Sequence, residues 1–403
     1  MPIKFSRFHD LILPLGFDKI PSAVPLIRQI GNSNGPKRLG FMVASWRPRI
    51  RLLPCTILTL ILLLVGGVLL LKLGASKKDT NKKHGPQPPY FTGHYVNESA
   101  IPNHIWTFWA DCPPQIVLAF MKTWCMHNPG YKLTVLTLKN YKSHISDLEL
   151  DDVPIKDSMA RVSDILRLHA LAEHGGIWMD ATILCTTSLS WVHSIQVAEQ
   201  VEYVGFYISS FTNNMKYPIF ESWFFACIPK SPLVSSWRDE FMQLQKYGNA
   251  GKYIKALKAE GVDLQWLAIP EYLAIHASMQ KVLQKSGQAF RYHVHDCILG
   301  PLRYLADADW HSGNGVVSLV RDPETRSEVI KLRSWERKVI VSSSLWTSLA
   351  PFWYFITGQN FFEAFGVDYS AMKTKLCDIS SNPCTQLEKE YTSLRKSKTL
   401  ALL

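Results

Sequence analysis

The chain has 403 residues, of which 47% are hydrophobic and 12% aromatic, so it can form one large or two medium domains with a sizeable core. Its formal net charge of +11 favours anionic partners such as phosphates, nucleotides and acidic lipid surfaces. Basic charge also suits nucleic acid. However, the sequence contains no Cys/His finger, no RNA-binding aromatic signature and no basic helix with a dimerising heptad, so we expect no nucleic-acid partner.

Residues 52–71, LLPCTILTLILLLVGGVLLL, contain no charged residue and are bounded by Arg51 and Lys72. An α-helix of about twenty residues crosses the ~30 Å hydrocarbon core of a bilayer. The alternative is a buried core helix, but such a helix seldom lacks any polar face over this length. The run is also too long, and begins too late, for a signal peptide. It therefore predicts a single transmembrane helix.

The larger positive cluster lies before this run, in residues 1–51, which favours a cytosolic N-terminal tail and a lumenal remainder. The glycosylation sequon Asn97-Glu98-Ser99 falls on the predicted lumenal side. Seven of the eight cysteines follow the span, and in an oxidising lumen some of them can pair, although spacing does not reveal which. We expect a single-pass type II membrane protein of the Golgi or ER, glycosylated at Asn97.

The remaining chain divides by composition. Residues 72–98 are rich in Pro, Gly and Lys and are expected to form a solvated stem. Residues 99–340 are expected to form the main folded domain, and 341–403 an apolar segment and C-terminal tail. No charge occurs from Val339 to Phe362. The run contains Pro351 and many hydroxyl groups, so we favour a buried core segment, an interfacial patch or a cradle for an apolar acceptor over a second span.

A strand–helix–strand unit begins the predicted folded domain. The aromatic segment His104–Trp109 reads as a strand, a helix is expected after Pro114, and Tyr131–Leu138 reads as the next strand. A βαβ unit of this length implies parallel strands joined by a right-handed crossover. In such α/β sheets ligands bind at the carboxyl ends of the strands.

The segment 157–176, DSMARVSDILRLHALAEHGG, predicts the most regular helix of the chain. Asp157 or Ser158 can cap its start, and Gly175-Gly176 can end it. The letters IWM then predict a strand that ends at Asp180. Further helices are expected at 233–245, 250–260 and 271–284.

Three charged side chains, Arg161, Asp164 and Arg167, form one stripe on this helix, whose other surface is largely apolar. In one interpretation the stripe neutralises itself, because each arginine lies three residues from Asp164. In the other it belongs to a ligand site. The second gains weight because Asp180 follows closely at a strand end, where Arg can bind phosphate or sugar hydroxyls and a carboxylate can bind a cation or hydroxyls.

The segment RVSDILRLHALAEHGGIWMDAT, residues 161–182, resembles the core of DXD-type glycosyltransferases with the GT-A fold, including the family-32 sugar transferases and the glucosyltransferase domains of large clostridial toxins. The segments IPNHIWTFW, HNPGYKL and YLAIHASMQKVLQ resemble more closely the capsular-polysaccharide-synthesis-like group, which includes fungal glycosyltransferases acting on natural products. The resemblance covers about residues 100–340. It implies an α/β fold with a Rossmann-like nucleotide-sugar-binding domain and a mixed sheet.

The resemblance also implies roles for individual residues. Trp106 would stack on the nucleotide base, with a core position as the alternative. Ser163 and Asp164 would contact ribose or the donor sugar, and Arg167 the sugar hydroxyls. Asp180 would be the first acid of the DXD motif and would contact ribose, sugar or metal.

Thr182 stands where the family pattern has the second acid, which is the principal metal ligand. A hydroxyl oxygen can bind Mg²⁺ or Mn²⁺, but it lacks the charge that dominates binding of hard cations. We therefore expect Mn²⁺ or Mg²⁺ to be held by Asp180 and Thr182 more weakly, or through water.

Other candidates rest on thinner patterns. His293 and His295, next to Asp296, would share one face of a strand, where a metal role competes with a surface position. Glu221, with Trp223 nearby, is a candidate acid on the acceptor side, or part of a strand edge. The segment KLRSWERK can close over a diphosphate or simply solvate a loop; its charged members include Lys331, Arg333, Glu336 and Arg337.

These observations predict a membrane-anchored enzyme that moves a hexose from a UDP- or GDP-sugar to a hydroxyl of a glycan, a polysaccharide or a lipid-like natural product. The resemblance suggests retention of the anomeric configuration; inversion would need a base such as Glu221. The rival from another class is a non-catalytic, membrane-anchored protein that binds carbohydrate or nucleotide sugar. A glycoside hydrolase ranks last, because no evident pair of carboxylates faces one bond.

Overall fold

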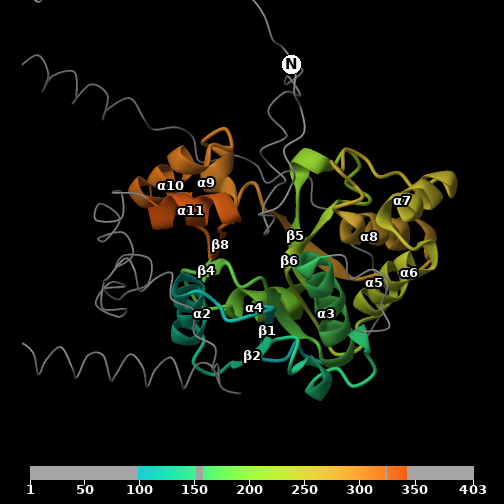
Figure 1. Ribbon diagram of the computed structural model, residues 1–403, viewed down its shortest axis with the longest axis horizontal. Coiled ribbons are helices and arrows are strands. Elements are labelled where there is room, and N and C mark those ends of the chain that lie inside the picture. Colours follow the sequence, from blue (N-terminus) through green and yellow to red (C-terminus); the bar gives the residue numbers. More distant parts are fainter. Residues whose placement is uncertain (1–98, 151–157, 323–324, 343–403) are drawn as a thin grey trace, which may run out of the picture. The chain divides into compact units, whose positions relative to one another are not determined.

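The computed structural model describes residues 99–150, 158–322 and 325–342, all within one compact unit (Figure 1). Within these ranges, no helix is both long enough and apolar enough to cross a bilayer. The predicted tail at 1–51, the span at 52–71, the stem at 72–98 and Asn97 lie outside the described residues, as does most of 341–403.

The predicted βαβ unit is confirmed. Strand β1 (His104–Phe108) is followed by α2 (Gln115–His127) and β2 (Lys132–Leu136). The two strands are parallel, with Ile105 opposite Leu133.

The main sheet is mixed, as the resemblance implies. Its order is β2-β1-β3-β6-β5-β7, where β3 is Gly176–Met179, β5 is Tyr203–Tyr207, β6 is Phe220–Cys227 and β7 is Tyr292–Asp296. β6 runs antiparallel to both β3 and β5, and the other pairings are parallel. All residues of β6 are buried, so this segment is an interior strand and not a sheet edge.

The helices agree closely with the expected positions. The predicted helix at 233–245 is divided between α5 and α6, the one at 250–260 is α7, and the one at 271–284 is α8. The remaining bounds are α3 (Met159–His174), α4 (Ser190–Glu199), α5 (Pro232–Met242), α6 (Leu244–Tyr247), α7 (Ala250–Ala259), α8 (Ala274–Lys285), α9 (Arg303–Ala306), α10 (Ser312–Arg321) and α11 (Ser334–Ser342), with short 3-10 turns at Tyr141–Ser143 and Ser209–Phe211.

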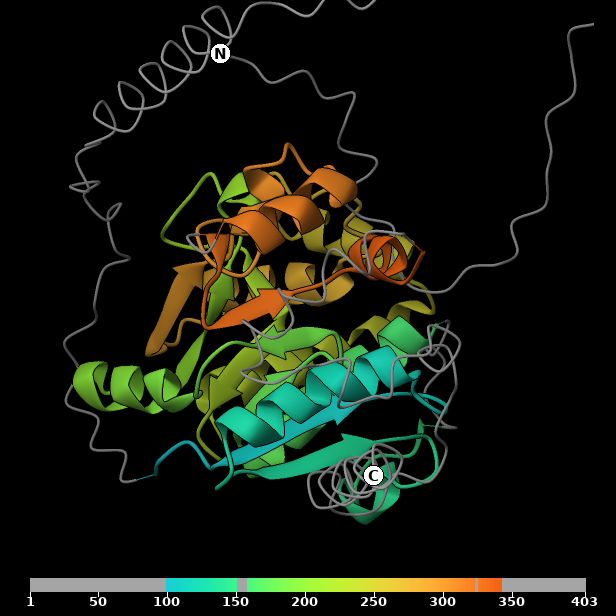
Figure 2. The ribbon, with the colours of Figure 1, turned by 90° about the vertical axis from the view of Figure 1, so that its left-hand side faces the viewer.

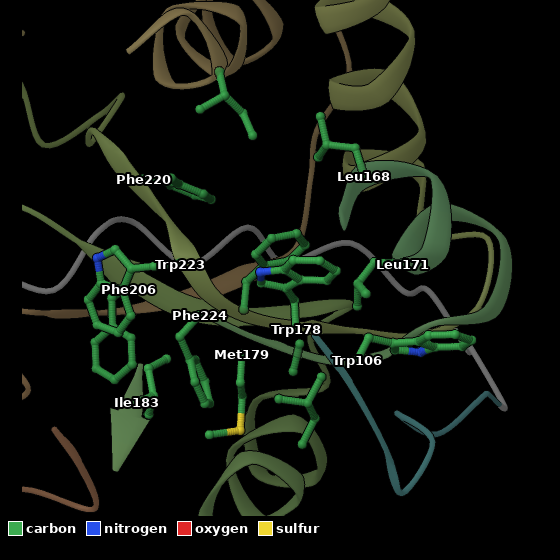
Figure 3. Close-up of a cluster of buried hydrophobic side chains, with 14 of the residues drawn as sticks. Trp106, Leu168, Leu171, Trp178, Met179, Ile183, Phe206, Phe220, Trp223 and Phe224 are labelled. Carbon is green, nitrogen blue, oxygen red and sulfur yellow. The ribbon is translucent and has the colours of Figure 1, made fainter. Parts of the chain in front are cut away.

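Helices cover both faces of the sheet. The two faces can be told apart on one strand, because neighbouring side chains of a strand point to opposite faces. On β6, Phe224 stacks with Trp191 of α4, whereas its neighbour Phe225 packs against Trp237 of α5. Trp237 in turn donates from Nε1 to the carbonyl of Ile275 in α8. Figure 3 shows the aromatic and aliphatic side chains of this core on both sides of the strands.

The connection from α3 to β3 sets the position of Asp180. The side chain of Ser158 accepts a hydrogen bond from Arg161 N and caps the helix, as expected. Gly175 and Gly176 end it with φ of +63° and +99°. A Cβ atom at Gly176 would lie 2.5 Å from the His104 carbonyl oxygen, so only glycine fits between α3 and β1.

A small second sheet brings a distant segment to the same place. Strand β4 (Ile183–Cys185) pairs antiparallel with β8 (Val329–Lys331), with Ile183 opposite Lys331. Figures 1 and 2 show β8 joined to α9, α10 and α11, which group together beyond the end of β4. The residues that follow β3 are therefore next to a strand from much later in the chain.

We predict that Gly176→Ala lowers the free energy of unfolding by about 2–4 kcal/mol, because it combines a disfavoured φ with a backbone clash. Gly248→Ala is the matched control, since Gly248 also has a positive φ (+72°) but nothing lies within 4 Å of its added Cβ. The control should cost about 1 kcal/mol in chemical denaturation. Equal losses for the two variants would contradict the proposed packing constraint.

Candidate functional site

Asp180 follows the last residue of β3 and begins a tight turn. Its N–H donates to the Trp223 carbonyl at 2.9 Å, and its own carbonyl accepts from Ile183 N at 3.0 Å. The backbone is thus held on both sides, between β6 and β4. The carboxylate side chain keeps 23% exposure, more than that of any charged side chain in contact with it. Asp180 is the member of this charged group that a ligand can reach most directly.

Both oxygens of the Asp180 carboxylate are bound by donors. Lys331 Nζ lies 2.6 Å from Oδ2. Arg167 Nη2 lies 3.2 Å from Oδ1, and the Trp178 indole donates to the same oxygen at 3.1 Å. Two cations and one neutral donor therefore hold a single carboxylate.

Arg167 is committed to protein contacts. Its Nη1 donates to the carbonyl and hydroxyl oxygens of Ser222 at 2.6 and 2.8 Å. Its Nη2 donates to Ser163 Oγ at 3.0 Å, and its Nε to the Ser163 carbonyl at 3.3 Å. With 6% of its side chain exposed, Arg167 holds Asp180 in place and has little surface left for a sugar. Ser163 likewise lies against Arg167.

The self-neutralising stripe expected on α3 is present but extends further than the helix. Asp164 lies 3.6 Å from Arg161 Nη1 and 3.5 Å from Arg167 Nη2. Arg167 also reaches Asp180, so it joins the stripe to the strand end. Burial raises the pKa of Asp164 and outweighs the opposing effect of the two arginines. The self-neutralising interpretation is therefore confirmed for α3, and a role of the stripe in a ligand site stays a prediction.

The charges around Asp180 keep its carboxylate ionised. Burial pushes the pKa of Asp180 upward, but Lys331 and Arg167 outweigh burial and the pKa lies below its usual value. Burial lowers the pKa of Lys331, and the adjacent Asp180 offsets part of that effect.

Thr182 does not complete a cation clamp. Its hydroxyl lies 3.4 Å from Lys331 Nζ, so the ammonium group lies within reach of both Asp180 and Thr182. A divalent cation with hard oxygen ligands needs carboxylates that are free to bind it. The Asp180 carboxylate is already bound by Lys331, and no group of three His, Cys, Asp or Glu side chains in the described ranges can hold a metal. These residues do not fit the Mn²⁺ or Mg²⁺ site that the resemblance implies.

The structure separates the charged members of the KLRSWERK segment. Arg333 binds Glu336 through Nε at 3.1 Å and Nη2 at 2.9 Å, and Glu336 also accepts from the Arg333 N–H at 2.8 Å, which caps the start of α11. Lys331 binds Asp180 instead. Arg337 is half-buried and lies near enough to Asp180 and Lys331 for their charges to affect one another.

Trp106 has the core position that was the alternative to base stacking. Its side chain is 2% exposed and its Nε1 donates to the Gly175 carbonyl at 3.1 Å. The rings of His104 and His174 stack with it, at centroid distances of 3.8 and 5.4 Å. Figure 3 shows it on the far side of Trp178 from Trp223. A base could stack on Trp106 only after these histidines moved.

Of the other candidates, Glu221 and His293 have partners other than Asp180, whereas Trp223 contacts the Asp180 group. Glu221 is buried in β6 and faces His276 at 3.4 Å. His293 Nδ1 lies 2.6 Å from Glu199, and the His293 ring packs against His295. No third ligand joins these histidines among the described residues. Trp223 contributes its backbone carbonyl to Asp180 and its ring to Lys331, at 5.7 Å.

Sequence reasoning missed two contributors, Trp178 and Ser222. Trp178 lies two residues before Asp180, so the alternation of a strand puts both on one face, which was a usable signal. Ser222 receives Arg167 from a different element, and no local pattern marks it.

The partly buried His104 ring, which stacks on Trp106, generates a pH prediction. Burial is the main reason that the pKa of His104 falls from 6.5 to about 3, with Lys132 adding to the effect. As pH falls, His104 therefore binds a proton at a higher pH in the unfolded chain than in the folded one. The stability contributed by neutral His104 is lost as pH falls from about 6.5 towards 3.

We expect the unfolding free energy of wild type to decline on acidification by up to about 1 kcal/mol per pH unit more than that of His104→Gln. Denaturant melts at pH 7.0, 5.5 and 4.5 measure the difference. Parallel pH profiles for the two proteins would show that His104 does not titrate as the burial argument requires.

Comparison with known proteins agrees with the predicted resemblance. Residues 80–254 match the family model described as capsular polysaccharide synthesis protein. No curated protein matches the chain.

Several solved structures are similar over part of the chain. PaToxG glycosyltransferase is 14% identical over 47% of this chain and 78% of its own, with a TM-score of 0.29. The glycosyltransferase GlyE of Streptococcus pneumoniae is 13% identical over 68% of this chain and 62% of its own, with a TM-score of 0.34. The bifunctional glycosyltransferase WbbM is 10% identical over 66% of this chain and 54% of its own, with a TM-score of 0.32. The chain spans less than two thirds of the length of the last two.

The family match covers α3, the Gly-Gly connection, β3 and the turn at Asp180, whereas the segment YLAIHASMQKVLQ lies outside it. Over residues 80–254 the chain is therefore similar to the capsular polysaccharide synthesis family.

Proposed function

We propose that the chain transfers a hexose from a nucleotide-diphosphate sugar, with UDP or GDP as the nucleotide, to a hydroxyl group of an acceptor. The observation that carries the proposal is the Asp180 carboxylate, which is ionised, partly exposed and held at a strand end between Arg167 and Lys331. In α/β sheets this is the end at which ligands bind.

The charges of the site suit the chemistry of donor cleavage. When the bond between C1 of the sugar and the diphosphate oxygen breaks, positive charge develops on the sugar and negative charge on the leaving diphosphate. The exposed edge of the Asp180 carboxylate can stabilise the sugar, and the neighbouring cations can stabilise the leaving group. Preorganised charges of this kind act without reorganising during the reaction.

We further propose that transfer retains the anomeric configuration. The acceptor oxygen would attack C1 on the face that the diphosphate leaves, and the acceptor proton would pass to the departing phosphate oxygen. Glu221, the candidate base for inversion, is buried against His276, which favours retention without a dedicated base. In this mechanism Arg167 is a positioning residue that acts through Asp180.

The expectation of a membrane anchor at 52–71 and a lumenal catalytic domain in the Golgi or ER belongs to the same proposal. It is supported by Cys112 and Cys125, which are both disulfide-bonded, because such bonds persist in oxidising compartments. The acceptor class stays open between a glycan, a polysaccharide and a lipid-like natural product. The uncharged run that favours an apolar acceptor lies largely outside the described residues.

A non-catalytic nucleotide-sugar-binding protein is the second candidate. One observation favours it: Lys331 already neutralises the Asp180 carboxylate, and Thr182 supplies no second acid. Such a protein would bind donor without breaking the bond to the sugar. Measurements of binding and hydrolysis on the same preparation separate the two functions.

We expect the full-length chain in detergent to bind at least one of UDP-glucose, UDP-N-acetylglucosamine and GDP-mannose in calorimetric titration, and to hydrolyse it slowly without acceptor. Asp180→Asn should lower hydrolysis by about 10²- to 10³-fold, because the amide cannot stabilise developing positive charge. Asp239→Asn is the control, since Asp239 is an exposed acid on α5. Donor binding with no hydrolysis by wild type, under any condition, would favour the non-catalytic candidate.

A further inference from the structure

The ammonium group of Lys331 lies at the point where a DXD-type enzyme would need its cation. Its Nζ is 2.6 Å from Asp180 Oδ2 and 3.4 Å from Thr182 Oγ1. These are the first and third residues of the motif. The absence of a second acid at position 182 and the position of Lys331 therefore fit together. Where the cation is the Lys331 ammonium group and not a metal ion, a second carboxylate is not needed to bind it.

We infer that Lys331, together with Arg337, takes the place of the divalent cation, binds the donor's diphosphate and makes transfer independent of metal. This inference rests on the proposed nucleotide-sugar donor. It assigns Lys331 and Arg337 to the leaving group and Asp180 to the sugar side of the same bond.

The backbone holds Lys331 firmly enough for such a role. Its N–H donates to the Pro301 carbonyl at 3.2 Å, and its carbonyl accepts from the Tyr304 hydroxyl at 2.8 Å. The next residue, Leu332, donates its N–H to the Thr182 carbonyl at 3.2 Å, which ties β8 to the turn after Asp180. With 12% of its side chain exposed, Lys331 is enclosed but not sealed off.

An ammonium group has three N–H donors, and its neighbours leave room for a ligand. Asp180 Oδ2 takes one donor at short distance, and Thr182 Oγ1 lies at the limit for a second. A phosphate oxygen can accept the remaining donor while the Asp180 contact persists. Lys331 can therefore join the carboxylate to the diphosphate, as a bridging cation would.

Arg337 supplies a second positive charge, and no hydrogen bond or ion pair within the described ranges satisfies it. No carboxylate or carbonyl in the described ranges receives a hydrogen bond or ion pair from its guanidinium, although the side chain is half-buried. Burial lowers the pKa of Arg337, and both Glu336 and Asp180 oppose that effect. By contrast, the neighbouring cations are engaged elsewhere. Arg333, just before α11, binds Glu336, and Lys338 on α11 lies over the Trp335 ring.

The balance of charge also fits an anionic ligand. The cations of the group are Arg161, Arg167, Lys331 and Arg337, whereas its carboxylates are Asp164 and Asp180. The adjacent Glu336 also acts on Arg337, but its own charge is paired with Arg333. Four positive charges face two negative ones, so the surplus matches both charges of a donor's diphosphate. Burying an uncompensated surplus is costly, and a bound diphosphate would remove that cost.

The first test is metal dependence, measured on full-length wild type with UDP-glucose, UDP-N-acetylglucosamine and GDP-mannose. We expect donor binding and hydrolysis to change less than about twofold between excess EDTA and added MnCl₂ or MgCl₂. Loss of activity in EDTA with recovery in MnCl₂ would overturn the inference while leaving the proposed function intact. Absence of donor binding and of hydrolysis under every condition would overturn both.

The second test exchanges the side-chain cation for a metal. Lys331→Met should weaken donor binding and hydrolysis by about 30- to 100-fold, because a charged donor to the leaving group is lost. The double variant Lys331→Met with Thr182→Asp restores a two-acid motif and should regain hydrolysis only with MnCl₂. Thermal melts identify any variant that fails to fold. Activation of Thr182→Asp alone by MnCl₂ would show that Lys331 does not occupy the cation position.

The third test separates Arg337 from its neighbour on the same helix. Arg337→Ala should weaken calorimetric binding of the donor about tenfold or more, and UDP or GDP should weaken in parallel because the contact is to phosphate. Lys338→Ala is the matched control and should leave binding within about twofold, because Lys338 is exposed and packs on Trp335. Equal effects of the two substitutions would remove Arg337 from the inference.

Discussion

The contact between Asp180 and its two cations is the constraint on which the site depends. A carboxylate that is three-quarters buried costs several kcal/mol unless opposite charges compensate it, and here Arg167 and Lys331 both do so. They come from α3 and β8, which are separated by more than 150 residues of chain. The ion pairs are therefore satisfied only when the helix, the main sheet and the small second sheet are all assembled.

Backbone turns and strand pairings bring the helix, the main sheet and the small second sheet together around this contact. Gly175 and Gly176 let α3 turn directly into β3, so Arg167 and Asp180 meet across one short connection. Arg167 also donates two hydrogen bonds to Ser222 in β6, which connects α3 to an interior strand. The β4–β8 pairing delivers Lys331 from the other side. Removing one ion-pair partner would leave a buried charge unpaired, which typically costs about 3–5 kcal/mol of folding free energy. The same side chains therefore contribute both to stability and to the proposed site.

Local patterns predicted the local half of this arrangement. The periodicity and capping of α3, the glycine pair and the strand that ends at Asp180 all follow from neighbouring residues, and the structure agrees with each. The function of Trp106 was less accessible, because a strand pattern does not reveal that His104 and His174 cover the ring. The position of β6 (sequence FESWFFAC) in the sheet was ambiguous for a similar reason. An interior strand pairs with two neighbouring strands and an edge strand with one, and those strands lie elsewhere in the chain. Lys331 was recognisable as one of several clustered cations, yet its pairing with Asp180 spans 151 residues and has no local signature.

A lysine in place of a metal ion changes what the site can do. A divalent cation brings two charges and several exchangeable ligands, whereas the ammonium group of Lys331 brings one charge at a position set by its backbone. The second charge must then come from another side chain, and the half-buried Arg337 is the group placed to supply it. Such a site is assembled on folding and needs no ion from solution. However, the side-chain cations cannot rearrange their ligands as a metal ion can when the diphosphate departs. The leaving group therefore has to move relative to fixed cations. The distance between Lys331 and Asp180 is then a determinant of catalysis in its own right, because it sets how closely the separating charges of sugar and diphosphate can be held.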